Sequence, residues 1–224
     1  MTRSITIFVT LLLVLMTAHD ADAGRVADRL YEEAVRRHAD STPGERFDRY
    51  ARAAEEGHPA AQYNVAMMYA NGEAVNVDYQ QAVYWFRKSA DQRFAPAQLR
   101  LGELHYFGMG GLHPNPRTAF RLFETAAEQG DPDACLNLAV MLGSGDVVPP
   151  DTERARSMLQ CAAEGGNELA AEYLEELEAP PEGRFSAALQ RSFWHQQEQF
   201  WVEMAARFGV REAEEAVGGK NSDR

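Results

Sequence analysis

The sequence predicts an all-α protein, an α-α superhelix in which antiparallel helical hairpins stack side by side. Three observations predict this fold. A short apolar pattern begins at Ala61, returns 36 positions later at Ala97, and returns again after 37 more at Ala134. Each copy is followed by a glycine-containing break, and a second apolar helical run follows that break behind a capping residue in constant register. Units of this length cannot bury an apolar face alone, so they must stack.

The first residues have the pattern of a secretory signal peptide. Arg3 precedes an apolar run from Ile5 to Met16, and the small residues Ala21 and Ala23 mark a cleavage site. This run of 12 residues is shorter than the roughly 20 needed to cross a bilayer, and no stop-transfer charges follow it. We therefore expect a signal peptide over residues 1–23, cleavage after Ala23, and a periplasmic or secreted product.

The charge of the chain excludes some classes of partner. The 224 residues carry a net charge of −12, and removal of the predicted leader, with one arginine and two aspartates, leaves −11. An acidic chain without a basic cluster is not expected to bind nucleic acid or anionic lipid. The histidines are scattered and no paired Cys-x-x-Cys occurs, so we expect neither a metal site nor a cofactor. They are His19, in the predicted leader, and His38, His58, His105, His113 and His195.

Two helical hairpins are expected in the N-terminal part. Helices over residues 24–38 and 45–56 form a degenerate opening hairpin (24–58), as expected for the atypical terminal unit of a solenoid. Repeat 1 (59–95) begins with a helix from Pro59 to Ala70, which Asn71 and Gly72 end. Asp78 then caps a second helix that reaches Asp91.

Two further repeats follow the same plan. In repeat 2 (96–131) the first helix ends near Phe107, a glycine-rich turn spans residues 108–111, and Asn115 caps the second helix. In repeat 3 (132–166) the break spans residues 143–145 and Asp151 is the cap. The glycine-rich turn lacks the preceding strand and the following Lys-Ser/Thr of a phosphate loop, so we interpret it as a turn only.

The C-terminal part departs from the repeats. A capping helix and linker (167–181) end at Pro180 and Pro181, and an amphipathic helix is expected over 182–217, before a disordered tail over 218–224. This helix either covers the open face of the last repeat or docks on the concave face or a partner, where it would regulate access. Its apolar stripe comprises Leu189, Phe193, Trp194, Phe200, Trp201, Met204 and Phe208.

With these residues in hand, the chain resembles the Sel1-like repeat family, a branch of the tetratricopeptide-type solenoids. The resemblance covers about residues 44–178, and Ser89 departs from it by standing where the pattern has alanine. The positions that match in the first full unit include Ala61, Tyr69, Gly72, Val75, Asp78, Ala82, Trp85, Phe86, Lys88 and Ala90. Small residues at Ala66, Gly102 and Ala139 are expected to let the facing helix approach closely.

The resemblance implies a binding surface on the first helix of each hairpin, which family members turn inward. The residues expected to face this concave surface are Tyr63, Met67, Asn71, Leu99, Glu103, Phe107, Leu136 and Val140. Aromatic, apolar and amide groups suit a peptide or a helix of another protein. The alternative is that Leu99, Leu136 and Val140 only pack between helices.

The two cysteines leave a disulfide open. Cys135 lies near the start of one helix and Cys161 near the end of its antiparallel partner, so both lie at the same axial level. Cysteine-rich Sel1-like proteins place their pair eight residues apart across consecutive units, where this chain has Ala127. The resemblance therefore gives no support for a Cys135–Cys161 bridge.

These patterns favour a non-enzymatic protein-binding module, an exported adaptor or regulator. The alternative is a β-lactam-binding or hydrolysing protein, as described for some cysteine-rich relatives. The sequence has no G-x-S-x-G and no S-x-x-K motif for that chemistry. An immunity or inhibitor protein that covers a basic toxin is a further variant of the binding class.

Overall fold

The structure, a computed structural model, describes residues 23–145 and 147–178, and all regular secondary structure in these ranges is α-helical. The predicted leader, the 182–217 helix and the tail lie outside the described residues. A helix over residues 23–36 opens the described chain. It is followed by α2 (Pro43–Glu55), α3 (Pro59–Asn71), α4 (Tyr79–Asp91), α5 (Ala95–Phe107), α6 (Pro116–Ala127), α7 (Pro132–Ser144), α8 (Thr152–Glu164) and α9 (Glu168–Glu178).

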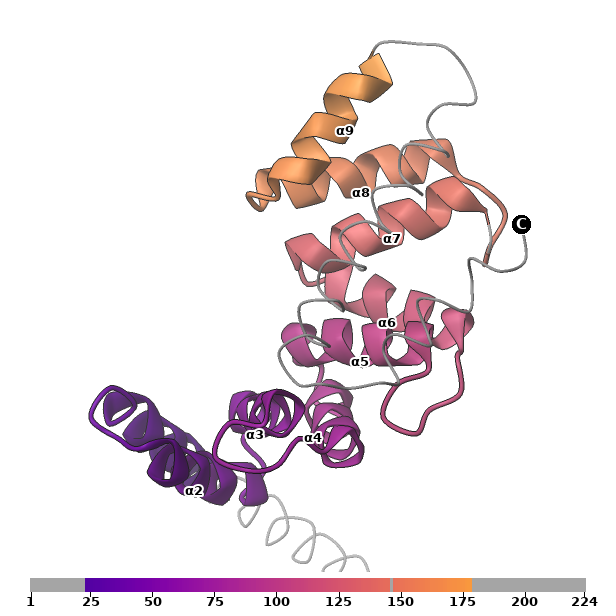
Figure 1. The fold of residues 1–224 in the computed structure, drawn as a ribbon. Coiled ribbons are helices and arrows are strands. Elements are labelled where there is room, and N and C mark those ends of the chain that lie inside the picture. Colours follow the sequence, from indigo (N-terminus) through magenta and orange to yellow (C-terminus); the bar gives the residue numbers. More distant parts are fainter. Residues whose placement is uncertain (1–22, 146, 179–224) are drawn as a thin grey trace, which may run out of the picture.

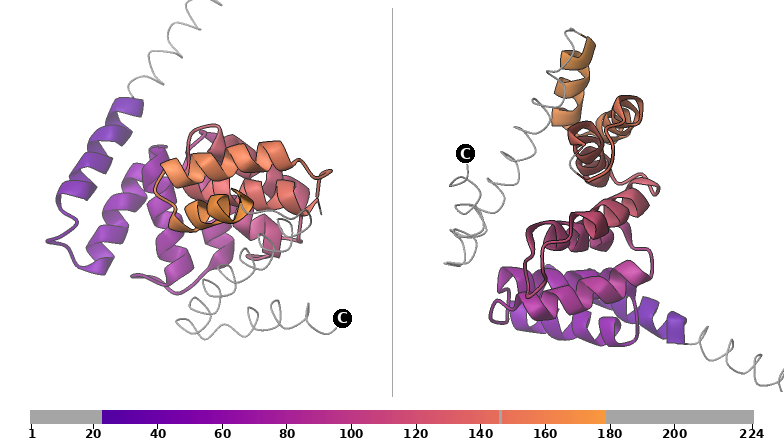
Figure 2. Two further views of the ribbon diagram at one scale, coloured as in Figure 1. Left: turned by 90° about the horizontal axis from the view of Figure 1, so that it is seen from above. Right: turned by 90° about the vertical axis from the view of Figure 1, so that its right-hand side faces the viewer.

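The helices form a stack that rises from α2 at one end to α9 at the other (Figure 1). The right-hand view of Figure 2 shows the same ascending order by colour. Buried apolar clusters join three consecutive helices at a time, first α3 with α4 and α5, then α7 with α8 and α9. Each hairpin is therefore stabilised by its neighbours, as predicted for a solenoid.

Three capping residues start the second helix of each repeat, as the sequence predicts. Asp78 accepts a hydrogen bond from the Gln81 amide at 2.9 Å. Asn115 and Asp151 accept equivalent bonds at 3.1 Å and 3.0 Å, in each case from the amide of the residue three positions later in the chain. These bonds satisfy amide groups that the first helical turn leaves free, so they fix where α4, α6 and α8 begin.

Glycines end the first helix of each repeat. Gly72, Gly108 and Gly145 follow α3, α5 and α7 with φ angles of 66°, 73° and 74°, a left-handed conformation that L side chains rarely adopt. The expected break at residues 143–145 is shorter than predicted. Gly143 and Ser144 belong to the last turn of α7, because Gly143 is buried within the packed helix.

The opening hairpin also differs slightly from its prediction. We expected α2 to begin at Glu45, but it begins at Pro43, since Thr42 acts as its cap. The Thr42 side chain accepts from the Glu45 amide while the Glu45 carboxylate accepts from the Thr42 amide at 2.9 Å. This reciprocal pair is a capping box.

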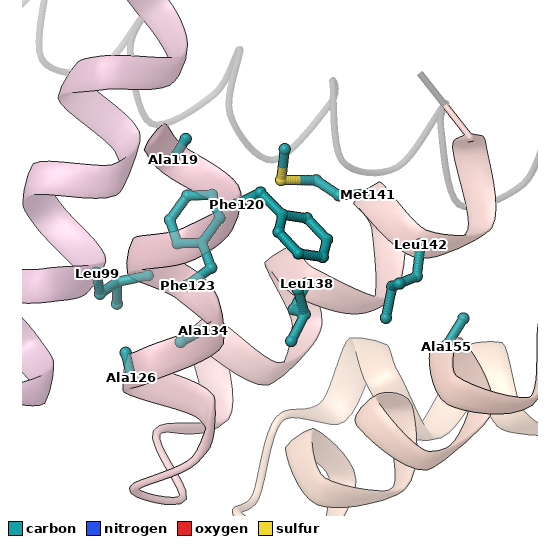
Figure 3. Close-up of a cluster of buried hydrophobic side chains, with 10 residues drawn as sticks. All are labelled: Leu99, Ala119, Phe120, Phe123, Ala126, Ala134, Leu138, Met141, Leu142 and Ala155. Carbon is teal, nitrogen blue, oxygen red and sulfur yellow. The ribbon is translucent and has the colours of Figure 1, made fainter. Parts of the chain in front are cut away.

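Small residues line the contacts between helices. Ala66, Gly102 and Ala139 are buried on the first helices, and Ala82 and Ala119 are fully buried on the second helices. Figure 3 shows one such region, where side chains from α5, α6, α7 and α8 converge. Its buried members are Leu99, Ala119, Phe120, Phe123, Ala126, Ala134, Leu138, Met141, Leu142 and Ala155.

Candidate protein-binding face

We call the side of α3, α5 and α7 that carries the eight predicted residues the A face. These residues are equivalent between repeats, because Tyr63, Leu99 and Leu136 are spaced by 36 and 37 positions. In each helix the next member lies four residues on, which keeps it on the same helical side. The predicted residues therefore lie on one side of the first helix in each of three successive repeats.

The A face is more exposed at its N-terminal end than at its C-terminal end. Four of its residues, Tyr63, Met67, Asn71 and Phe107, are partly exposed. The others are buried, namely Leu99, Glu103, Leu136 and Val140, with exposed fractions between 4% and 6%. The surface available for a partner among the described residues is therefore centred on α3 and the end of α5.

Three of the buried residues belong to apolar clusters. Leu99 lies in the cluster of Figure 3, together with Phe123 of α6 and Leu138 of α7. Leu136 and Val140 belong to the next cluster, which includes Tyr173 of α9. This burial supports the packing alternative for these three residues, and it separates them from the exposed part of the A face.

The exposed part of the A face rests on packed aromatic groups. The Tyr63 ring lies 5.7 Å from the Phe86 ring and 5.7 Å from the Phe94 ring, measured between centroids. Met67 and Phe107 pack against the buried cluster of α3, α4 and α5. Side chains that are fixed on one side and accessible on the other lose little conformational entropy when they bind a partner.

An ion pair lies within the α5 part of the A face. The Arg100 Nη1 atom is 2.9 Å from the Glu103 Oε2 atom, and the Glu103 side chain is 8% exposed. Burial raises the pKa of Glu103, and the charge of Arg100 opposes this rise. The Glu103 carboxylate in turn raises the pKa of Arg100, so the arginine is charged at every accessible pH.

Glu103 is a predicted site residue, whereas its partner Arg100, three residues earlier on α5, was not predicted. An acidic residue followed or preceded at helical spacing by arginine is usually a solvated surface pair, so the signal is weak in sequence. Asp131 and Asp133 at the start of α7 also raise the pKa of Glu103, so this region of the A face carries an excess of acidic groups.

A surface hollow, which no sequence pattern indicated, lies at the junction between α8 and α9. Its volume is about 540 Å³, and its lining comprises Pro132, Asp133, Gly165, Gly166, Asn167, Glu168, Leu169 and Glu172. The Asn167 side-chain amide donates to the Asp133 carboxylate at 3.0 Å across the start of α7. Gly165 permits this close junction, because a Cβ atom there would lie 2.4 Å from Cγ of Pro132.

The two cysteines of repeat 3 are bonded to each other in the structure. Cys135 and Cys161 form a disulfide that links α7 to α8, with their Cα atoms 6.1 Å apart. This Cα separation is typical of disulfides. Cys135 is fully buried, and neither cysteine is among the eight residues of the A face.

The described residues contain neither a helix suited to span a membrane nor a clustered set of metal ligands. No described helix has the length and apolar content to cross a membrane. Within residues 23–145 and 147–178, no cluster of three or more histidine, cysteine, aspartate or glutamate side chains is arranged to hold a metal ion.

The stacked hairpins and their aligned glycine turns define the class of protein, an α-solenoid of helical hairpins. Residues 59–94, 95–131 and 132–167 each match the family model of the Sel1 repeat. The chain belongs to the Sel1-like repeat family, a family whose members are generally interaction scaffolds rather than enzymes.

Solved structures and one curated relative support this assignment. A Sel1 repeat protein of Oxalobacter formigenes is 26% identical with a TM-score of 0.59, covering 89% of this chain and 77% of its own. A protective antigen of uropathogenic Escherichia coli is 25% identical with a TM-score of 0.57, covering 77% of this chain and 39% of its own. An uncharacterized protein of Neisseria meningitidis is 33% identical over 154 residues, covering 53% of this chain and 32% of its own. The chain thus spans about a third of that relative.

Proposed function

We propose that this protein is an exported adaptor or regulator that binds a protein or a peptide on the exposed part of the A face. The single observation that carries the proposal is the group formed by Tyr63, Met67 and Phe107. All three are partly exposed, and each packs from one side against the buried cluster of α3, α4 and α5. Aromatic and methionine side chains in this state are typical anchors of protein interfaces.

The class of ligand follows from the shape and chemistry of this surface. The three anchors come from two helices of adjacent repeats, so a ligand that contacts all of them must be extended over several residues. A peptide or an amphipathic helix meets this requirement, because its side chains repeat at fixed intervals. The nearby acidic groups, Glu103 with Asp131 and Asp133, favour a ligand with basic residues beside its apolar ones.

Affinity capture tests this proposal with matched variants. Purified mature protein is immobilised and exposed to an envelope extract, and retained proteins are identified by mass spectrometry. A Met67→Ala/Phe107→Ala variant should lose the specific partner. A Gln80→Ala variant should retain it, because Gln80 is an exposed residue of α4 and lies outside the A face. Circular dichroism confirms that both variants remain folded. Equal retention by all three proteins contradicts the use of the A face.

Export is a separate part of the proposal, and its support is the leader pattern of Arg3, Ile5–Met16 and Ala21–Ala23. The test is N-terminal sequencing of the protein recovered from cells that express the full chain. We expect the recovered chain to begin at Gly24 and to be found outside the cytoplasm. A cytoplasmic protein that retains Met1 or Thr2 contradicts export.

A further inference from the structure

A pair of glutamine side chains connects the two helices of each of the first two repeats. In repeat 1 the Gln92 side-chain amide, just beyond the end of α4, donates a 2.8 Å hydrogen bond to the Gln62 side-chain oxygen on α3. In repeat 2 the Gln129 amide donates an equivalent bond of 2.7 Å to Gln98 on α5. Both acceptors are buried near the start of their helices, and neither bond can be broken by a redox reaction.

The same buried glutamines connect each repeat to the hairpin before it. The Gln62 side-chain amide donates to the Ala54 carbonyl of α2 at 3.1 Å. The Gln98 amide donates to the Ala90 carbonyl of α4 at 3.4 Å. In both cases the carbonyl belongs to the residue eight positions earlier in the chain. One buried glutamine in each repeat therefore joins three helices.

Repeat 3 has a cysteine at this position and no glutamine to bond with it. Cys135 lies 37 residues after its equivalent, Gln98. Where repeat 2 has the glutamine donor, repeat 3 has Gly165, and a Cβ atom there would lie 2.4 Å from Cγ of Pro132. The rigid proline ring therefore excludes a glutamine bridge from repeat 3. The disulfide between Cys135 and Cys161 joins α7 to α8 instead.

The two cysteines of this disulfide differ in their access to solvent. Cys135 is fully buried in the cluster of α7, α8 and α9, whereas Cys161 is partly exposed on α8. A thiolate breaks a disulfide by attack on one of its sulfur atoms, and access helps to decide which sulfur is attacked. A thiolate that arrives from solvent is therefore directed to the Sγ atom of Cys161, and the buried sulfur of Cys135 is the leaving group.

We infer that Cys161 is a site of thiol–disulfide exchange with low-molecular-mass thiols, and that this exchange controls the C-terminal end of the solenoid. The thiolate of the small thiol attacks Cys161 Sγ and forms a mixed disulfide there, while the bond to Cys135 breaks. The Cys135 sulfur leaves with the electron pair and takes a proton from water. A second thiolate then attacks the small-thiol sulfur of the mixed disulfide, so that the protein gains two thiols and the small thiol is oxidised to its own disulfide.

The structure has an acceptor in place for the Cys135 thiol that this exchange releases. Cys135 Sγ lies 3.8 Å from the Ala127 carbonyl oxygen, again eight residues earlier in the chain. This carbonyl is equivalent to those that Gln62 and Gln98 bind, and a thiol can donate a weak hydrogen bond to it. Reduction therefore keeps a contact between α7 and the preceding repeat, whereas the covalent link between α7 and α8 is lost without a glutamine to replace it.

Loss of this link acts on the end of α8, on α9 and on the hollow between them. The cluster that contains Cys135 also contains Ala170 and Tyr173 of α9. The turn over residues 165–167, which follows α8, forms part of the lining of the hollow. Repeats 1 and 2 keep their glutamine bridges, so they should not respond to thiols. This inference does not rest on the proposed binding function, and its tests contain no partner.

Partial reduction of the unmodified full-length chain tests the site of attack. The probe is 2-mercaptoethanol, a neutral thiol that the acidic surface of the protein does not repel. The reaction is stopped with acid, and trypsin then cleaves at Arg154 and Arg156, between the two cysteines. We expect the first mixed disulfide on the peptide that contains Cys161. A first adduct on Cys135, or no adduct on either cysteine until the chain unfolds, overturns the inference.

Two matched variants measure the difference between the two sulfur atoms directly. Cys135→Ala leaves only the Cys161 thiol, and Cys161→Ala leaves only the Cys135 thiol. With 5,5′-dithiobis(2-nitrobenzoate) as the probe, we expect Cys161 to react at least about tenfold faster in native buffer. The two rates should become similar in denaturant. Similar rates in native buffer, with both variants folded by circular dichroism, overturn the inference.

Hydrogen–deuterium exchange of the unmodified chain, with and without 2-mercaptoethanol, measures the structural consequence. We expect reduction to increase exchange at least about tenfold at the end of α8 and in α9, and to leave α3 and α4 unchanged. The Cys161→Ala variant is the control, because it should show the faster exchange under both conditions. Unchanged exchange in α8 and α9 after full reduction overturns the inference. An equal increase in every helix also overturns it, since the disulfide would then stabilise the whole protein rather than its C-terminal end.

Discussion

Phe123 of α6 lies so close to Gly102 of α5 that a Cβ atom at Gly102 would stand 2.6 Å from the Phe123 Cε1 atom. Phe123 is almost fully buried, at 1% exposure, so its ring has little space into which it can move. The absence of a side chain at Gly102 is therefore what allows α5 and α6 to approach each other, and it gives a physical reason for a small residue at this position of the repeat.

Substitution of Gly102 should destabilise the protein through overpacking. We expect Gly102→Leu to lower the free energy of unfolding by about 1–3 kcal/mol or more, because the new side chain must displace the Phe123 ring. Urea denaturation measures the change. Gly44→Ala is the control, since no heavy atom lies within 4 Å of a Cβ at that site and Gly44 lies in the first turn of α2. A Gly102→Leu protein as stable as the control contradicts this packing.

Features set by neighbouring residues in the chain were predictable from the sequence. The helix caps and the helix-ending glycines interact only with residues close to them in the chain, so the residue type alone predicts them. They are Asp78, Asn115 and Asp151 for the caps, and Gly72 and Gly108 for the glycines. The spacing between equivalent alanines gave the stacking of the hairpins, because one register recurs at each helix contact.

The exposure of the A face was not predictable in the same way. Tyr63 and Leu136 occupy equivalent positions, yet Tyr63 is partly exposed and Leu136 is buried. Leu136 packs within the cluster of α7, α8 and α9, and contacts between separate helices are not visible in the sequence. The Arg100–Glu103 pair was missed for a related reason. Its sequence spacing is common on solvated helices, and only the fold shows that the Glu103 carboxylate is enclosed.

Ser89 offers a second stability test, since it replaces the alanine of the family pattern. Its hydroxyl donates a 2.7 Å hydrogen bond to the Pro59 carbonyl and so ties the end of α4 to the start of α3. Ser89 is fully buried. We expect Ser89→Ala to lower the free energy of unfolding by about 1 kcal/mol, because the bond is lost while the small volume is kept.

The matched control for Ser89 is Thr125→Ala. The Thr125 hydroxyl bonds only to carbonyl groups of its own helix, those of Arg121 and Leu122. Its removal should change the free energy of unfolding less than the removal of the Ser89 hydroxyl. If Ser89→Ala leaves the free energy of unfolding unchanged or raises it, the hydrogen bond to Pro59 makes no net contribution to stability.

His58 should make the N-terminal hairpin sensitive to acid. Its Nδ1 atom accepts a 3.2 Å hydrogen bond from the Ala61 amide and so caps α3. Its ring stacks on Tyr31 with centroids 4.0 Å apart. Burial lowers the pKa of His58, and the nearby Asp28 carboxylate opposes this shift. Protonation would convert Nδ1 into a donor, so the cap would be lost.

The sign of the pH dependence follows from this lowered pKa. The unfolded chain binds a proton at His58 at a higher pH than the folded chain does, so stability is full above the ordinary histidine pKa and is lost as pH falls through the folded value. We expect the melting temperature to fall between about pH 7 and pH 5. His58→Asn keeps a capping side chain without a titratable ring, so this variant should lose less stability over the same interval. Identical pH profiles for both proteins contradict the role of His58.

The Cys135–Cys161 disulfide is expected to form under oxidising conditions and to stabilise repeat 3. Purified protein that is denatured without reductant should resist alkylation at both cysteines, and prior reduction should make both reactive by mass measurement. The bond closes a loop with a sequence separation of 26 residues. Loop closure of this length corresponds to about 3 kcal/mol of stabilisation.

Cys161→Ala is the cleaner variant for this test, because Cys161 is only partly buried whereas Cys135 is fully buried and its replacement would also disturb packing. We expect Cys161→Ala to be less stable than the oxidised protein by roughly the same 3 kcal/mol. Reductant should lower the stability of the unmodified chain to that of the variant and should leave the variant unchanged. Reactive thiols at both positions before reduction would show that α7 and α8 are held together by packing alone, in the same way as the cysteine-free hairpins α3–α4 and α5–α6.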